Sequence, residues 1–251
     1  ASLQYGTQFG GLVNFKMKAP NPNRLLEFQT RNTLGSNNLY TNFTSLSGTK
    51  NKLGYYAFFN YKEGDGFRDN SNFSSRNMYL KLVYKLSDKT EISGEITYLN
   101  YLAKQAGGLN DAMFDNDPYQ SNRSRNWFAI NWLLYNAKVT HEFSESTKFS
   151  FNFFGLDATR DALGFRTNRV DQPDIFDNFF GSYEERDLIK GNFNNYGFES
   201  RLIHNYKLLN KNATALLGVK YYKAKNIGKQ GPGSSGSGPD FSFQTQQYID
   251  Y

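Results

Sequence analysis

Cysteine is absent from this chain of 251 residues, and histidine occurs only twice, at His141 and His204. The lack of cysteine excludes disulfide bonds, thiol catalysis and cysteine-based metal sites, and two histidines are too few for a histidine-rich metal centre. No run of 18 or more apolar residues occurs, which excludes a membrane-spanning helix. A net charge of +6 without a basic stripe does not indicate nucleic-acid binding. We therefore expect no metal site, no cofactor and no nucleic-acid partner.

Aromatic residues, by contrast, make up 17% of the chain, which is too many for a disordered segment. They alternate strictly with polar residues over long stretches, and such alternation is typical of β-strands with one apolar and one polar face. The clearest apolar rows are Leu53, Tyr55, Ala57, Phe59 and Tyr61 in residues 53–62, and Met78, Leu80, Leu82, Tyr84 and Leu86 in residues 77–86. The pattern predicts an all-β chain.

The connections between the predicted strands alternate between short turns and long polar loops, except that the first, Gly35-Ser36-Asn37, is short where a long loop is expected. The alternation predicts about ten strands, near residues 24–34, 38–47, 51–62, 76–86, 90–102, 127–143, 147–158, 194–207, 212–224 and 241–250. The long loops are predicted at residues 63–75, 103–126, 159–193 and 225–241. The last loop contains a run rich in glycine and serine, Gly231–Pro239, which we expect to be a flexible loop tip.

Two all-β architectures produce such alternation. A soluble β-sandwich has strands of about 5–6 residues and no strict order of short and long loops. A transmembrane β-barrel has strands of about 9–11 residues, with short turns at one end and long loops at the other. The predicted strands have about 10–17 residues, and their apolar rows end in aromatic residues of the kind found at membrane interfaces. We therefore favour a transmembrane antiparallel β-barrel, with the soluble sandwich as the alternative.

The first twenty residues differ from the rest, since they contain a glycine-punctuated turn followed by a short apolar strand. They read Tyr5-Gly6, then Gly10-Gly11-Leu12-Val13-Asn14-Phe15-Lys16, with Pro20 and Pro22 before the first long strand. This segment resembles the YGxxxxGGxVNxxxK segment of TonB-dependent outer-membrane receptors, which closes their plug domain just before the first barrel strand.

A second stretch narrows the resemblance. It reads Gln105-Ala106-Gly107-Gly108-Leu109, followed by Phe114-Asp115, Tyr119-Gln120-Ser121 and Arg123. This order is similar to a long-loop stretch of the receptors of the ferric-citrate type.

The resemblance implies a barrel of about 22 strands that is plugged by an N-terminal domain and lies in the cell outer membrane. Residues 1–20 would be the C-terminal end of the plug domain, and residues 21–251 the N-terminal part of the barrel, with about ten of its strands. The resemblance further implies an importer of an iron chelate, not an enzyme. Its partners would be a ferric chelate, outer-membrane lipid and the TonB complex, which would bind through a region outside this chain.

An anionic chelate is best bound by arginine, because the planar fork of the guanidinium matches a carboxylate. The candidate ligand-binding residues in the predicted loops are Arg123, Arg125, Arg166 and Arg169, with Gln105 and Gln120 as neutral hydrogen-bonding partners. The alternative is that these arginines are solvated or pair with Asp115, Asp117, Asp171 and Asp174, as surface charges commonly do.

Charged residues of the polar rows are expected to point into the barrel, where they would hydrate its wall, pair with the plug or line a substrate path. They are Lys62, Lys81, Glu91, Glu95, Lys138, Glu142, Glu199, Arg201 and Lys220. No apolar pocket near the paired carboxylates and no nucleophile motif is evident, so we expect no catalysis. Other functions stay open: an importer of cobalamin or an oligosaccharide, a passive porin, or a soluble carbohydrate-binding sandwich. The plug-end segment argues against the porin, which has no plug.

Overall fold

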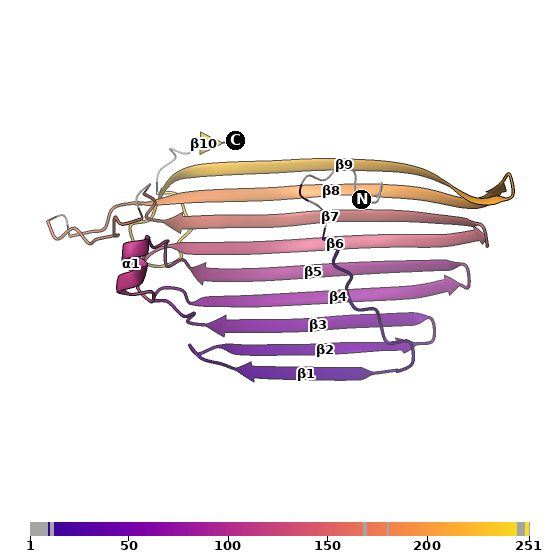
Figure 1. The fold of residues 1–251 in the computed structure, drawn as a ribbon, viewed down its shortest axis with the longest axis horizontal. Coiled ribbons are helices and arrows are strands. Elements are labelled where there is room, and N and C mark those ends of the chain that lie inside the picture. The colour runs from indigo at the N-terminus through magenta and orange to yellow at the C-terminus, as the bar shows by residue number, and fades with distance from the viewer. Residues whose placement is uncertain (1–9, 11–12, 168–169, 180, 245–248, 251) are drawn as a thin grey trace.

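The structure is a computed structural model, and it describes residues 10, 13–167, 170–179, 181–244 and 249–250. These residues form one antiparallel sheet in which each strand pairs with its neighbours in sequence (Figure 1). The strands are β1 (Glu27–Leu34), β2 (Tyr40–Lys50), β3 (Leu53–Gly64), β4 (Phe73–Ser87), β5 (Thr90–Lys104), β6 (Trp127–Ser144), β7 (Thr147–Gly164), β8 (Arg186–Leu208), β9 (Lys211–Gly233) and β10 (Ile249–Asp250). A short helix, α1 (Asp111–Asn116), lies between β5 and β6. The prediction of an all-β chain is confirmed.

The described part of the chain contains no helix that is both long enough and apolar enough to cross a membrane.

Short and long connections lie at opposite ends of the sheet, except that the short connection 35–39 between β1 and β2 lies at the end of the long ones (Figure 1). Tight turns join β2 to β3, β4 to β5, β6 to β7 and β8 to β9 at what we call the turn end. In the last of them Leu209 and Asn210 both have positive φ, 51° and 59°, as a primed hairpin turn requires. The connections 65–72, 105–126, 165–185 and 234–248 lie at the opposite end, the loop end. The predicted alternation of turns and loops is therefore correct.

Three strands extend further toward the loop end than the sequence predicted. β7 reaches Gly164, β8 begins at Arg186 and β9 ends at Gly233, so the loops predicted at 159–193 and 225–241 are shorter in the structure. Polar residues occur on both faces of these extensions, and the alternation that marks a strand with one apolar face is therefore absent. The backbone pairing continues regardless of the side chains.

The strand predicted at 241–250 is only partly present in the described residues. It is represented by β10 and by a bridge between Gly233 and Phe243, while residues 245–248 lie outside the described part of the chain.

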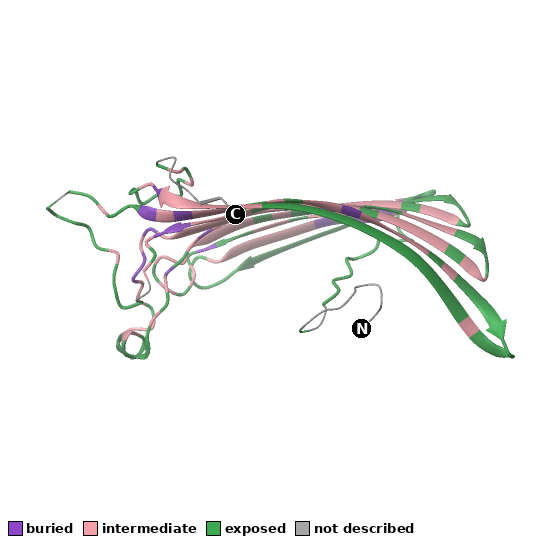
Figure 2. Cartoon of the chain, turned by 90° about the horizontal axis from the view of Figure 1, so that it is seen from above, coloured by how far each residue is buried: buried purple, intermediate pink, exposed green. Residues whose placement is uncertain are grey.

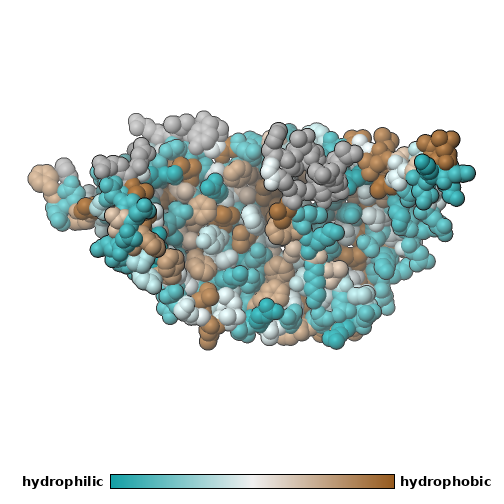
Figure 3. Space-filling model, viewed as in Figure 1, coloured by the Kyte–Doolittle hydropathy of each residue, from teal (hydrophilic) through white to brown (hydrophobic). Residues whose placement is uncertain are grey.

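The pairing register places the two predicted apolar rows on one face of the sheet. Ala57 of β3 is opposite Leu80 of β4, which in turn is opposite Ile96 of β5. The sheet is curved, and the N-terminal segment lies on its concave side (Figure 2). There the Lys18 ammonium is 5.6 Å from the centroid of the Tyr56 ring, a residue of the opposite row. The apolar rows therefore face the convex side, and the concave face mixes polar and apolar side chains (Figure 3).

The N-terminal segment differs from its prediction. Residues 13–20 have no regular secondary structure, because they cross the sheet over its side chains and meet no strand edge that could supply backbone partners. Phe15 and Met17 lie in a depression that also contains Tyr79 and Phe154. Residues 1–9, 11 and 12 lie outside the described residues, and the assignment of residues 1–20 to a plug domain stays a prediction.

Candidate ligand-binding site

A cavity of about 800 Å³ opens at the loop end of the concave face. Inward-facing residues of β6 to β9 form its floor, among them Phe128, Ala162 and Phe193, and the loops 105–126 and 165–185 form its rim. We call it the loop-side cavity. Its volume is within the range of about 300–1,000 Å³ that is usual for small-molecule sites.

The charged residues that line the loop-side cavity are all basic. They are Arg123, Arg160, Arg166 and Lys190, and no aspartate or glutamate is among its described lining residues. The guanidinium carbon of Arg160 is 5.4 Å from the centroid of the Phe128 ring, and that of Arg123 is 5.2 Å from the Phe165 ring. A guanidinium stacked on an aromatic face keeps its N–H edge available for an anion. The cavity is therefore suited to a negatively charged ligand with an apolar part.

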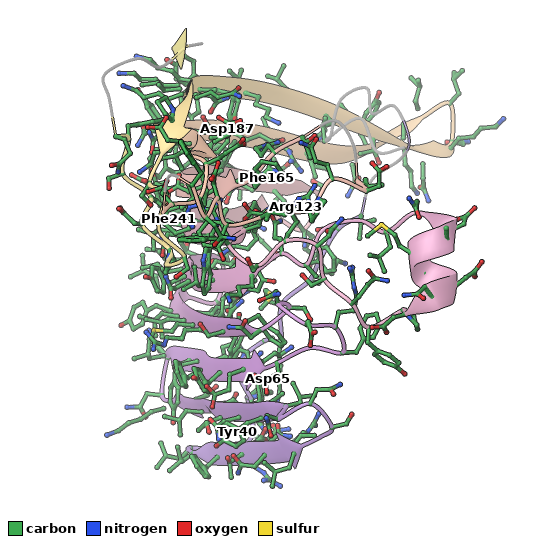
Figure 4. The ribbon with its side chains drawn as sticks, turned by 90° about the vertical axis from the view of Figure 1, so that its left-hand side faces the viewer. Tyr40, Asp65, Arg123, Phe165, Asp187 and Phe241 are labelled. Atoms are coloured by element: carbon green, nitrogen blue, oxygen red, sulfur yellow. The ribbon has the colours of Figure 1, made fainter. Side chains whose placement is uncertain are left out.

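Arg123 is held firmly at the cavity wall. It is only 6% exposed, and its Nη1 donates hydrogen bonds to the carbonyl oxygens of Asn122 and Gln172, each at 2.7 Å. Figure 4, which looks at the loop end, shows Arg123 beside Phe165. Burial lowers the pKa of the Arg123 guanidinium, while Asp174 acts in the opposite direction. Because arginine stays protonated in proteins, Arg123 supplies a fixed positive charge.

Arg125 lies two residues away but does not line the cavity. It is 1% exposed, and its Nε and Nη2 donate to the two carboxylate oxygens of Asp174 at 2.7 and 2.6 Å. Its Nη1 donates to the carbonyl of Ser235 at 2.6 Å, and its guanidinium carbon is 4.1 Å from the centroid of the Tyr183 ring. Arg125 thus joins three loops to one another, and its pairing with an aspartate matches the alternative that the sequence left open.

Arg186 completes this group, which we call the arginine cluster and define as Arg125, Asp174 and Arg186. The Arg186 side chain donates to the Ser234 carbonyl at 2.7 Å, to the Ser234 hydroxyl at 2.6 Å and to the Arg125 carbonyl at 2.9 Å. Trp127 Nε1 donates to the carbonyl of Ser237 at 2.8 Å. The run 231–239 is therefore not a flexible tip throughout, because its start belongs to β9 and its serine carbonyls accept hydrogen bonds from Arg125, Trp127 and Arg186.

The remaining sequence candidates divide between the cavity and other places. Gln105 and Arg166 line the cavity, and the Arg166 guanidinium is 3.8 Å from the Asp187 carboxylate. Gln120 lies elsewhere, since its Nε2 donates to the Met113 carbonyl at 2.6 Å, beside α1. Arg169 lies outside the described residues. The structure thus brings together Gln105, Arg123 and Arg166.

Sequence reasoning missed Arg160. The predicted strand ends at residue 158, which places Arg160 in a predicted loop, whereas Arg160 is an inward-facing residue of β7 opposite Ile130 and Gly191. The alternation of side chains along a strand could have identified Arg160. It lies an even number of residues from Phe154 and therefore on the same face of the strand.

The charges predicted to point into the barrel all belong to the concave rows. Five of them line a second depression near mid-height: Glu95, Lys138, Glu199, Arg201 and Lys220. Lys81 is 3.8 Å from Glu95, and Arg201 is hydrogen-bonded to Glu199. These two pairs compensate four of the charges within the sheet. In the described residues, no group of three or more acidic or histidine side chains is placed to hold a metal ion.

Comparison with known proteins gives a match in structure but none in sequence. The chain matches no protein-family model and no curated protein. It is similar to the unliganded ferric citrate transporter FecA, with a TM-score of 0.71 and 18% identity over 88% of this chain and 32% of that one. It is also similar to P. aeruginosa FpvA in complex with a heterologous pyoverdine and iron, with a TM-score of 0.71 and 14% identity over 92% of this chain and 33% of that one.

A third match, the complex of FpvAI with pyocin S2, has a TM-score of 0.69 at 15% identity. FecA and FpvA are TonB-dependent receptors, which are not enzymes. The chain spans about a third of the length of these structures. They differ in ligand and match equally well, so the likeness does not select a substrate. The chain has the all-β fold of the barrel region of TonB-dependent receptors, over about a third of their length.

Proposed function

We propose that the protein is an outer-membrane TonB-dependent receptor that imports an iron chelate, and that the loop-side cavity binds this chelate. The observation that carries the proposal is the cavity itself, in which three arginines converge without an acidic lining residue on a sheet with the barrel fold of such receptors. The fold supports the transporter class, and the arginines support an anionic ligand.

The dimensions of the convex apolar face support a membrane location. On β3 the outward apolar row runs from Leu53 to Tyr61, a length of about 26 Å at about 3.3 Å per residue. The apolar band of transmembrane barrels is about 25 Å tall. Glu63 follows Tyr61 on the same face, so the band ends abruptly.

The position of this band along the sheet supports the same conclusion. On β9 the outward apolar row ends at Tyr221, because the next outward residue is charged. The pairing register from β3 to β9 places Tyr221 level with Tyr55 and not with Tyr61. The band thus moves about 20 Å toward the turn end while crossing six strand spacings, about 29 Å. If the band is level in a flat membrane, this shift requires the strands to be tilted by about 35°. Transmembrane barrels have strand tilts of about 35–45°.

The proposed ligand is a ferric chelate with carboxylate groups, of the ferric-citrate type. The stretch that resembles ferric-citrate receptors supplies Gln105 and Arg123 to the cavity, and FecA is a ferric citrate transporter. In this proposal the arginines bind the carboxylates, and residues 1–20 belong to a plug that closes the barrel. Energy would reach the plug from the TonB complex through a region outside this chain.

The test is the affinity of the full-length protein in detergent or bilayers for ferric citrate. Loss of one charged hydrogen-bonding partner costs about 1.5–3 kcal/mol, so Arg160→Ala and Arg123→Ala should each weaken binding about 10- to 150-fold. The matched control is Arg76→Ala, because Arg76 is an outward-facing arginine opposite Tyr61 and Asn100.

If Arg160→Ala and Arg123→Ala bind ferric citrate as tightly as wild type does, the loop-side cavity is not the binding site. If wild type binds cobalamin or an oligosaccharide and no ferric chelate, the importer class stays and the iron assignment fails. Ion conductance through the wild-type protein without any ligand affinity would instead favour a passive porin.

A further inference from the structure

The upper edge of the convex apolar band carries two lysines at one place. Lys223 and Lys225 are the first two outward-facing residues of β9 beyond Tyr221 toward the loop end. Their register partners on β8 are Tyr196 and Asn194. Both lysines are exposed, and neither has an ion pair or a hydrogen bond with a described residue. We call them the boundary lysines.

The described residues around the boundary lysines do not neutralise them. The nearest outward acid in the same cross-strand row is Asp157 of β7, two strand spacings or about 10 Å away from Lys225. The next outward lysine of β8 is different, because Lys190 donates to the Phe241 carbonyl at 2.9 Å and lies 3.7 Å from the Asp161 carboxylate. Among the described outward residues of β8 and β9 next to the apolar band, the unmatched positive charge therefore lies at Lys223 and Lys225.

We propose that the boundary lysines bind the phosphate groups of anionic lipids in the leaflet at the loop end. The inference rests on the proposed membrane location, since the apolar band then places both ammonium groups at the level of the lipid headgroups. Their side chains start about 7 Å apart on one face of the strand, so they can reach the same headgroup or two adjacent ones. The aliphatic stems can lie along the apolar band while the ammonium groups extend outward to the phosphates. A lysine near an anionic surface gains about fivefold in lipid affinity, so two together prefer anionic lipid about 25-fold.

The experiment measures lipid preference locally. This chain contains no cysteine, so Asn194→Cys introduces one labelling site into it. In the full-length protein the fluorophore at this site lies on β8, directly opposite Lys225. The protein is reconstituted in phosphatidylcholine vesicles with a quencher-labelled lipid, either phosphatidylglycerol or phosphatidylcholine. The ratio of the two quenching constants gives the preference for anionic lipid. A second label, Asn131→Cys, reports an outward position of β6 whose partners, Asn100 and Thr159, are uncharged.

The variants separate this site from general charge effects. The double substitution Lys223→Gln with Lys225→Gln should reduce the anionic preference at residue 194 about 25-fold. Lys220→Gln should leave it unchanged, because Lys220 is on the same strand but faces the concave side. The label at residue 131 should show little preference in any variant.

Free inorganic phosphate carries the same kind of anionic group as a lipid headgroup and is the alternative ligand of the boundary lysines. Inorganic phosphate should reduce the preference no more than a chloride salt of equal ionic strength does. Equal preference in wild type and the double variant, equal preference at residues 131 and 194, or specific competition by inorganic phosphate would each overturn the proposal. A wild type that folds only in detergent and never inserts into vesicles would instead refute the membrane location itself.

Discussion

Removal of the Arg125 side chain is the most severe test of how the loops are held. Asp174 is 2% exposed, and the Arg125 guanidinium is its bidentate partner, so Arg125→Ala leaves a buried carboxylate without its counter-charge. It also leaves the Ser235 carbonyl without its donor. Breaking a buried pair by deleting one partner costs about 3–5 kcal/mol. The strands at mid-height do not contact this group, so we expect the loss to appear as local opening of the loops and not as unfolding of the sheet.

Hydrogen exchange of the full-length protein in bilayers measures this opening. About 3–5 kcal/mol corresponds to a roughly 150- to 4,000-fold increase in the opening constant of residues 170–179 and 234–244. Amides of β3 and β4 should exchange as in wild type. Arg125→Met combined with Asp174→Leu should restore most of the protection, because it removes both charges together.

Two outcomes would refute this reasoning. If Arg125→Ala leaves exchange of these loops unchanged, the arginine cluster does not hold them. If the double variant opens them as much as Arg125→Ala does, the buried charge is not the cause.

Two further perturbations test the faces of the sheet and the shape of the cavity. Ala57→Arg places a charge on the convex apolar row and should lower folding stability in bilayers by about 2–4 kcal/mol. Asn60→Arg on the concave row should not lower it. Equal losses of stability in urea titrations of the two variants would contradict the assigned faces. Gly107 has φ +81°, and an added Cβ would lie 2.6 Å from Cγ of Arg123. Gly107→Ala should therefore displace Arg123 and weaken chelate binding about tenfold or more; wild-type affinity would show that Arg123 is not needed where it lies.

The strands and their faces could be predicted because both depend on local sequence. A period of two requires only neighbouring residues, and where one face meets an apolar environment every second residue is apolar, as from Leu53 to Tyr61. Beyond the apolar band this cause disappears. The ends of β7 to β9 carry polar residues on both faces, so the sequence marked them as loops although their backbone pairing continues.

The arrangement of the arginines could be predicted only in part. Loop position and residue type identified Arg123 and Arg166, which do line the cavity. The roles of Arg125 and Asp174 depend on a contact between residues 49 positions apart, and nothing in the local sequence distinguishes Arg125 from Arg123. Arg160 was missed for the separate reason that the end of its strand was misplaced.

Quenching of a fluorophore by bound iron tests the central claim most directly, because it locates the chelate. In the full-length protein, Thr167→Cys places a label at the rim of the loop-side cavity, and Lys89→Cys places one at the turn end, about 50 Å away along β5. We expect ferric citrate to quench the label at residue 167 saturably and to leave the label at residue 89 unaffected. Arg160→Ala should shift the half-saturating concentration of ferric citrate about 10- to 150-fold upward. Equal quenching at both labels, or quenching at residue 167 that saturates at the wild-type concentration in Arg160→Ala, would contradict this assignment of the site.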